Sequence, residues 1–209
     1  MSQPKTARVK RRHEQSRQEF VDGARRVLER DGLHALTLEA LGTELGVTKP
    51  AVYHYFSNKQ ELLRVLIAAD IIELTAAMRA AIDAAPDGAA ALCGLVRAFV
   101  AFYRERHEAF VLDNLWPQLV GLGAVGFDRR RVAEDVDPHM IACFGALESK
   151  LRAGKLPHGT NPRRLAVTAW ATAFGITSYA SMTSRGAGAL HGVDDLVAEA
   201  CAMLERSLS

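Results

Sequence analysis

The sequence contains no run of about 18 apolar residues, which is the length that a membrane-spanning helix needs. It begins MSQPKTARVKRRHEQ, a basic stretch without the apolar segment of a secretory signal. The three cysteines are scattered within apolar helical patterns, so they do not indicate a disulfide framework. We therefore expect a protein with no membrane span, located in the reducing cytoplasm.

Sequence patterns of catalysis and metal binding are also missing. There is no Ser, His and Asp in a triad order, no glycine-rich phosphate loop and no spacing typical of zinc ligands. Acids crowd residues 134–137, but Asp137 is better explained as a helix N-cap, because acids favour helix N-termini. The sequence therefore predicts no enzyme, no cofactor and no metal, although an all-helical enzyme that uses an aromatic cavity remains an alternative.

Positive charge is concentrated near the start of the chain. Residues 1–60 carry a formal charge of +4, whereas residues 61–209 carry −2. The first twelve residues contain five Lys or Arg and no acid. This basic arm on a body of mixed charge suggests a polyanionic partner near the N-terminus.

Helical periodicity runs along nearly the whole chain, and no segment alternates as a strand would. We expect an all-α fold of about nine helices, with a three-helix domain over residues 1–57 and a larger helical domain over residues 58–209. Ser57 and Gln60 have the spacing of a capping box. Residues 121–136 read as a loop, after which Asp137 and Pro138 are expected to begin a helix.

The stretch TKPAVYHYFSNKQELL, residues 48–63, combines ring side chains that have polar tips with two lysines. A helix over 37–45, a break at Gly46 and a second helix over 48–56 have the spacing of a helix-turn-helix. In that motif the second helix lies in the major groove of DNA, where Lys49 can reach a phosphate or a guanine edge. The sequence therefore predicts a DNA-binding surface, and a non-specific architectural DNA binder remains a second alternative.

Residues 37–63, TLEALGTELGVTKPAVYHYFSNKQELL, resemble the DNA-binding segment of the TetR/AcrR transcriptional regulators. The resemblance implies a homodimer that binds a palindromic double-stranded DNA operator. It also implies that binding of a small molecule releases the protein from DNA, and that the protein acts as a repressor, the commonest mode in the family. It also implies that eight residues lie near DNA: Thr37, Thr48, Lys49, Pro50, Tyr53, His54, Tyr55 and Lys59.

The same resemblance implies a ligand pocket in the larger domain and a dimer interface formed by the last two helices, about 162–185 and 193–207. Residues 170–175, WATAFG, are loosely similar to the W-x-x-x-H-G pattern of one subgroup, with Phe174 in place of His. Aromatic residues of the middle helices are the pocket candidates: Phe99, Phe102, Tyr103, Phe110, Trp116, Trp170, Phe174 and Tyr179. A pocket of this kind suits an apolar or aromatic effector, and plain core packing is the alternative role for these side chains.

Overall fold

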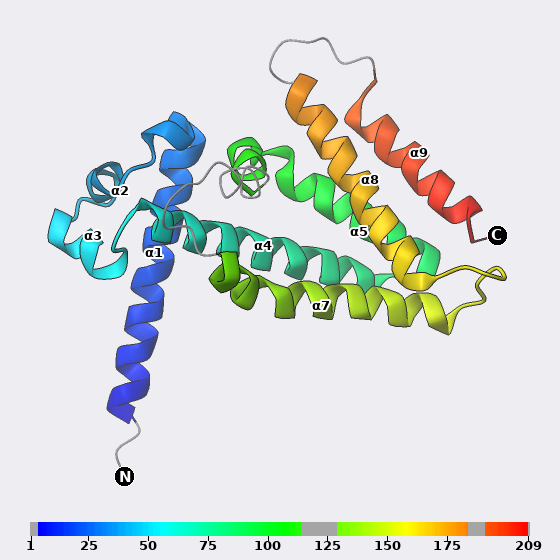
Figure 1. Cartoon of the computed structure of the whole chain (residues 1–209), viewed down its shortest axis with the longest axis horizontal. Helices are drawn as coiled ribbons and strands as arrows, with labels where there is room; N and C mark the ends of the chain where they lie inside the picture. Colours follow the sequence, from blue (N-terminus) through cyan, green and yellow to red (C-terminus); the bar gives the residue numbers. More distant parts are fainter. Residues whose placement is uncertain (1–3, 114–128, 184–190, 209) are drawn as a thin grey trace. The chain divides into compact units, whose positions relative to one another are not determined.

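The computed structural model describes residues 4–113, 129–183 and 191–208, with side chains from Arg17 in the first helix and from Arg130 after the first gap. Within these ranges every regular element is an α-helix, so the all-α fold class is confirmed (Figure 1). None of the described helices is both long enough and apolar enough to cross a membrane. The helices are α1 (Pro4–Ala35), α2 (Leu38–Leu45), α3 (Lys49–Tyr55), α4 (Lys59–Ala84), α5 (Gly88–Arg104), α7 (Arg129–Ala153), α8 (Pro162–Thr183) and α9 (Val193–Arg206).

The chain divides into two compact units, with divisions inside α4, after residue 107 and inside α7. One unit comprises residues 1–70 and 108–133, and the other comprises residues 71–107 and 134–209. The first unit contains all eight DNA-binding candidates. The compact units divide the chain at a different place from residues 57 and 58. Compactness does not test function, so the functional boundary between residues 57 and 58 remains a prediction.

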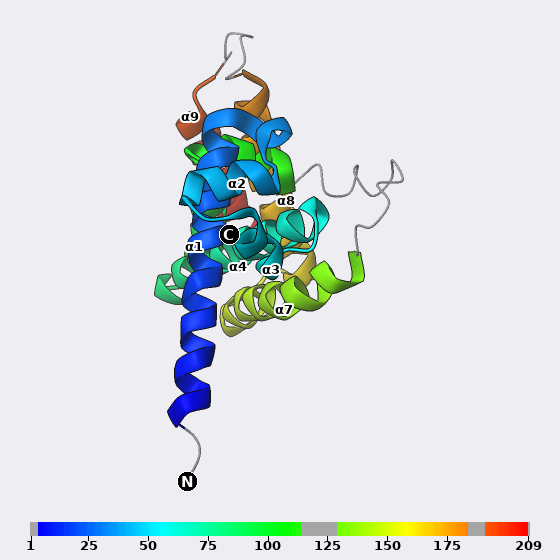
Figure 2. The same cartoon turned by 90° about the vertical axis from the view of Figure 1, so that its left-hand side faces the viewer.

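The basic stretch at the start of the chain belongs to α1, whose backbone is helical from Pro4 onward. The expected arm is therefore the first part of a 32-residue helix. This helix is broken at Gly32, where φ is 79° and falls in the region that glycine adopts without steric cost. Figure 2 shows α2 and α3 beside the C-terminal part of α1, and α2 packs against both of these helices.

The start of α4 is capped differently from the prediction. The side-chain oxygen Oδ1 of Asn58 accepts a hydrogen bond from the N–H of Glu61 at 2.8 Å. The Glu61 carboxylate in turn accepts from the backbone N–H and the hydroxyl of Ser57, at 2.8 and 2.6 Å. Asn58 thus satisfies the free N–H of Glu61 in the first turn of α4, and the predicted pair of Ser57 with Gln60 is wrong by one position.

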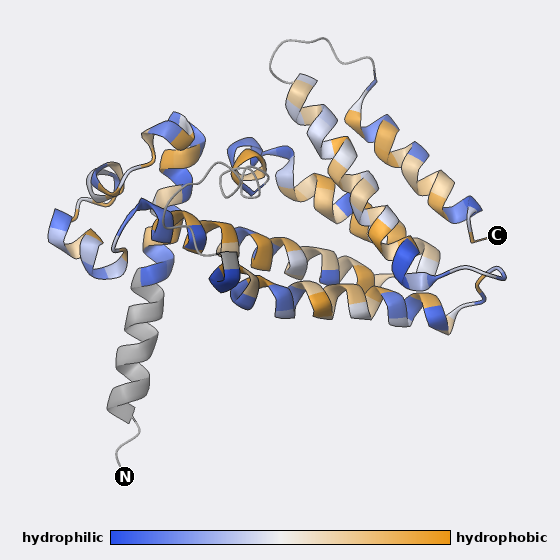
Figure 3. Ribbon diagram, viewed as in Figure 1, coloured by the Kyte–Doolittle hydropathy of each residue, from blue (hydrophilic) through white to orange (hydrophobic). Residues whose placement is uncertain are grey.

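The second unit is built around α5, which packs against both α8 and α9. The N-cap of α5 is Asp87, whose carboxylate accepts from the N–H of Ala90 at 2.8 Å. Figure 3 shows that α5 is hydrophobic along most of its length, and nine of its residues are buried. The buried residues of α5 that form this core include Leu92, Leu95, Val96, Phe99, Val100 and Tyr103.

The loop expected over 121–136 is wrong from Arg129 onward, because α7 begins there and continues through Pro138. Residues 121–128 lie outside the described part of the chain. Val132 and Val136, which precede the proline, are both buried and extend the apolar stripe of the helix. A proline inside a helix costs about 3 kcal/mol, so the burial of this stripe must outweigh the local signal to start a new helix.

Candidate DNA-binding site

A tight turn fixes α3 against α2. Gly46 takes φ 63°, and the next N–H, that of Val47, bonds to the carbonyl of Gly42 at 3.0 Å. A Cβ added at Gly42 would lie 3.3 Å from Cγ2 of Val52, so the two helices are in close contact at this point. Val52 is fully buried, which directs the other face of α3 outward. The predicted helix-turn-helix is therefore present, with the predicted break.

The outer face of α3 carries four of the predicted residues: Lys49, Pro50, Tyr53 and His54 are all exposed. The Lys49 amine lies 2.8 Å from the carboxylate of Glu39 on α2 and 5.4 Å from the ring centroid of Tyr53. The hydrogen bond between Lys49 and Glu39 raises the pKa of the lysine and lowers that of the acid. This face therefore combines a cation with aromatic and polar tips, which are groups that contact phosphates and base edges.

The two tyrosines of α3 have different environments. Tyr53 is 44% exposed, whereas Tyr55 is half-buried. The ring of Tyr55 packs against α1, where its centroid lies 4.5 Å from that of Phe20. The His54 ring lies edge-on to Tyr55 at 5.3 Å. Tyr55 therefore helps to hold α3 on the body of the unit, while Tyr53 is available to a partner.

Lys59 has a structural contact that the sequence did not predict. Its amine donates a hydrogen bond to the carbonyl of Leu33 at 3.1 Å, which ties the start of α4 to the end of α1. Burial lowers the pKa of this amine. A phosphate contact by Lys59 remains a prediction, and it would be made by a side chain that is already anchored.

The two predicted threonines also differ in role. Thr37 is the N-cap of α2, and its hydroxyl accepts from the N–H of Ala40 at 3.0 Å. Thr48 has N-cap backbone geometry at α3, but its side chain makes no capping bond and is exposed. Thr37 therefore stabilises α2 directly, whereas the Thr48 hydroxyl is available for another acceptor or donor.

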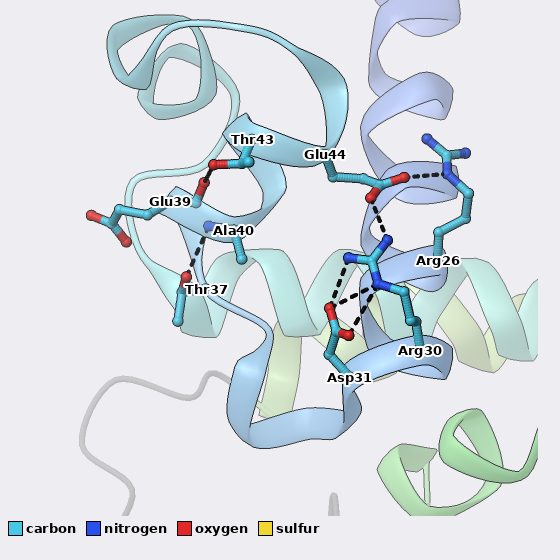
Figure 4. A network of polar contacts seen from close by, with 8 residues as sticks. All are labelled: Arg26, Arg30, Asp31, Thr37, Glu39, Ala40, Thr43 and Glu44. Atoms are coloured by element: carbon cyan, nitrogen blue, oxygen red, sulfur yellow. Dashed lines mark hydrogen bonds and ion pairs between the residues drawn. The ribbon is translucent and has the colours of Figure 1, made fainter.

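An ion-pair network joins α1 to α2 on the solvent side (Figure 4). The carboxylate of Glu44 accepts from Arg26 at 2.7 Å and from Arg30 at 2.8 Å, and Arg30 also bonds to Asp31. These bonds lower the pKa of Glu44. Sequence reasoning missed the network, since the partners come from separate helices. It indicates that these two arginines brace α2 in this unit.

A second ion pair joins α1 to α4 inside the same unit. The Arg25 guanidinium lies 2.6 Å from the carboxylate of Asp70, and Asp70 is fully buried. The outcome is that α1, α2 and the first part of α4 are connected by polar contacts as well as by the apolar core.

The aromatic pocket candidates are only partly brought together. In the second unit, Trp170 of α8 lies 6.5 Å from Phe99 and 5.8 Å from Phe174, measured between ring centroids. Tyr103 lies 5.2 Å from Phe99 and 5.0 Å from Phe102. These five rings form one cluster between α5 and α8, in which Phe99 and Tyr103 are buried.

The remaining three aromatic candidates lie elsewhere. Phe110 is in the other compact unit, and Trp116 lies outside the described residues. The hydroxyl of Tyr179 accepts from the backbone N–H of His191 at 3.3 Å, near the start of α9. The role of all eight residues as a pocket lining stays a prediction.

An open apolar groove of about 400 Å³ runs between α8 and α9. Large apolar side chains are exposed on these two helices, including Met203 at 60% and Val167 at 47%. Sequence reasoning expected an interface on these helices without locating the groove. The groove is lined by Leu165, Thr168, Thr172, Ile176, Leu196, Glu199, Ala200, Met203, Leu204 and Ser207.

The α2–turn–α3 unit and the exposed outer face of α3 have the geometry of a helix-turn-helix motif of the DNA-binding class. A family model described as bacterial regulatory proteins, tetR family, matches residues 20–66, which cover this unit. An uncharacterised HTH-type transcriptional regulator of Mycobacterium tuberculosis is 31% identical over 98 residues, 46% of this chain and 44% of that protein. The HTH-type nicotine-responsive transcriptional repressor of Paenarthrobacter nicotinovorans is 30% identical over 104 residues, 50% of this chain and 45% of that protein. These matches span less than half of the length of the curated relatives.

Two solved structures extend the likeness to nearly the whole fold. A protein of unknown function from Rhodococcus sp. RHA1 is 28% identical with a TM-score of 0.72, over 90% of this chain and 93% of that chain. A TetR family transcription regulator from Marinobacter aquaeolei VT8 is 14% identical with a TM-score of 0.67, over 95% of this chain and 98% of that chain. The chain is therefore similar to the TetR/AcrR family of transcriptional regulators, in sequence over residues 20–66 and in fold over nearly its whole length.

Proposed function

We propose that the protein is a homodimeric repressor in the cytoplasm, which binds a near-palindromic operator and is released by an apolar or aromatic small molecule. The observation that carries this proposal is the outer face of α3, where Lys49, Tyr53 and His54 are exposed on a helix that a glycine turn holds in place. In a helix-turn-helix, residues near the start of the second helix meet base edges. The repressor role is supported by the nicotine-responsive relative, which is described as a repressor.

The proposed dimer is supported by the groove between α8 and α9. An exposed apolar groove of about 400 Å³ is a surface that a second copy of the chain can cover. Covering it symmetrically would place four helices, two from each chain, in one bundle. A two-fold dimer presents two copies of α3, which accounts for an operator made of two similar half-sites.

The proposed effector response is a shift between populations of conformations. An operator requires the two copies of α3 at a fixed separation. A ligand that binds more tightly to a conformation with another separation therefore lowers the affinity for DNA, by the difference between its affinities for the two conformations. The aromatic cluster of α5 and α8 supports an aromatic or apolar ligand. For the relative in P. nicotinovorans, the described response is to nicotine, which is a small aromatic molecule.

The decisive experiment is to map the genomic fragments that the purified protein retains, and then to footprint the best of them at moderate salt. We expect a discrete protected site with two-fold symmetry, and affinity that falls steeply with salt because lysines displace counterions from phosphates. The variant Tyr53→Ala should weaken this protection, and Tyr53→Phe should tell whether the hydroxyl is responsible. Retention of random and genomic DNA with equal affinity would contradict the proposal and favour an architectural binder.

A further inference from the structure

An acidic side chain lies beside the outer face of α3. Glu39 is in the first turn of α2, and its carboxylate is 2.8 Å from the amine of Lys49, the first residue of α3. Both side chains are well exposed, at 59% and 62%. The same amine lies 5.4 Å from the ring centroid of Tyr53, so the contact crosses from α2 to the outer face of α3.

This ion pair is separate from the network that braces α1 against α2. Figure 4 shows the Glu39 carboxylate pointing away from the Glu44 carboxylate and its two arginines. An ion pair between two exposed side chains contributes little to stability, because water and salt screen it, so folding gains little from it. An acid close to a surface that binds phosphates is also a cost for any DNA complex, because the duplex carries a dense negative charge. Its position therefore calls for a role in binding.

We propose that Glu39 is a specificity-determining residue, which holds Lys49 toward the base edges and penalises binding to DNA that lacks the operator sequence. This inference rests on the proposed function. A lysine ammonium has three N–H donors, so Lys49 can keep its bond to Glu39 and still donate to the acceptors of a guanine edge. On a random sequence without the guanine, Lys49 can gain only a contact with a phosphate. Making that contact breaks its bond to Glu39, and the unpaired Glu39 carboxylate then lies close to the phosphates and is repelled by them.

The test is to compare Glu39→Gln and Glu39→Ala with the wild type on operator and on random duplex over a salt series. Freeing Lys49 for one phosphate should steepen the logarithmic salt dependence of random binding by about 0.9 and tighten it about fivefold near 0.15 M salt. Operator affinity should change less, so the ratio of operator to random affinity should fall. The matched control is Glu29→Gln, which removes the same charge from an exposed position on α1.

The result that would overturn the role of Glu39 is an unchanged salt dependence and an unchanged affinity ratio in both Glu39 variants. An equal effect of Glu29→Gln would also overturn it, since net charge alone would then be the cause. If the Glu39 variants lost a preference of the wild type for one particular cytosine in the operator, the proposed action through Lys49 would also be overturned, because Glu39 would then contact a base directly. The wild type separates this inference from the proposed function: a wild type that protects no operator refutes the function itself.

Discussion

Replacing Met203 on α9 by glutamate should separate the two chains of the proposed dimer. Met203 lines the groove between α8 and α9 and keeps 60% of its surface exposed. Because it is exposed in the single chain, the substitution Met203→Glu should leave the fold of each chain nearly unchanged. It therefore tests the association of two chains and not the stability of one.

The magnitude follows from this exposed fraction. Full burial of a methionine contributes about 1.5–3 kcal/mol, so the exposed 60% corresponds to about 1–2 kcal/mol per chain and about 2–4 kcal/mol per dimer. Each new carboxylate would also be buried beside Glu199, which lines the same groove, and a buried charge without a partner costs several kcal/mol. A total of at least about 4 kcal/mol would raise the dissociation constant of the dimer about a thousandfold.

The assay is sedimentation velocity at micromolar concentration, with thermal unfolding to confirm that the variant is folded. We expect a dimer for the wild type and a monomer for Met203→Glu, which should also lose operator binding although α3 is untouched. The matched control is Ile141→Glu on α7, which is 71% exposed and lies outside the groove. A stable Met203→Glu dimer, or equal dissociation of both variants, would refute the placement of the interface in this groove.

Three further predictions concern stability and reactivity. Thr37→Ala should lower the free energy of unfolding in urea by about 1 kcal/mol, since it removes the cap of α2, whereas Thr48→Ala should change it by less than about 0.5 kcal/mol. Arg25→Met should cost about 3–5 kcal/mol because it removes the guanidinium 2.6 Å from the buried Asp70 carboxylate, and adding Asp70→Leu should restore much of that loss. Burial raises the pKa of the Cys93 thiol to about 12, so about one thiol in ten thousand is ionised at pH 8. Mass spectrometry should then find Cys93 alkylated by iodoacetamide in urea and unmodified in the native protein.

The backbone of the helix-turn-helix could be predicted because its signals are local. The Thr37 cap and the Gly46 turn depend on residues at most four positions away, and the turn is present as predicted. The contact of Lys59 with the Leu33 carbonyl joins residues 26 positions apart, and no local pattern encodes it. The pair of Lys49 with Glu39 is likewise set by how α3 packs on α2. Side-chain partners between helices therefore required the structure.

The error at Pro138 has a similar cause. Asp137 followed by proline is a strong local signal for a helix start, and the analogous pair at Asn161 does begin α8 at Pro162. The two sites differ in what precedes them. Buried Val132 and Val136 stand before Pro138 at helical spacing, whereas residues 154–161, which include two glycines, precede α8 without helical backbone. A cap signal predicts a helix start only where no apolar stripe continues upstream.

The aromatic cluster and the proposed dimer groove are on different faces of α8, and this arrangement bears on how an effector can act. Trp170 packs toward Phe99 of α5, while Thr168 and Thr172 line the groove beside α9. Trp170 and Phe99 lie 6.5 Å apart between ring centroids, so a ligand that enters between these two rings would part Trp170 from α5. Because a helix moves as a stiff element, displacing one face of α8 also displaces the other. An effector that binds among these rings would therefore select a state in which the groove is altered, and this is the coupling that the proposed release from DNA requires.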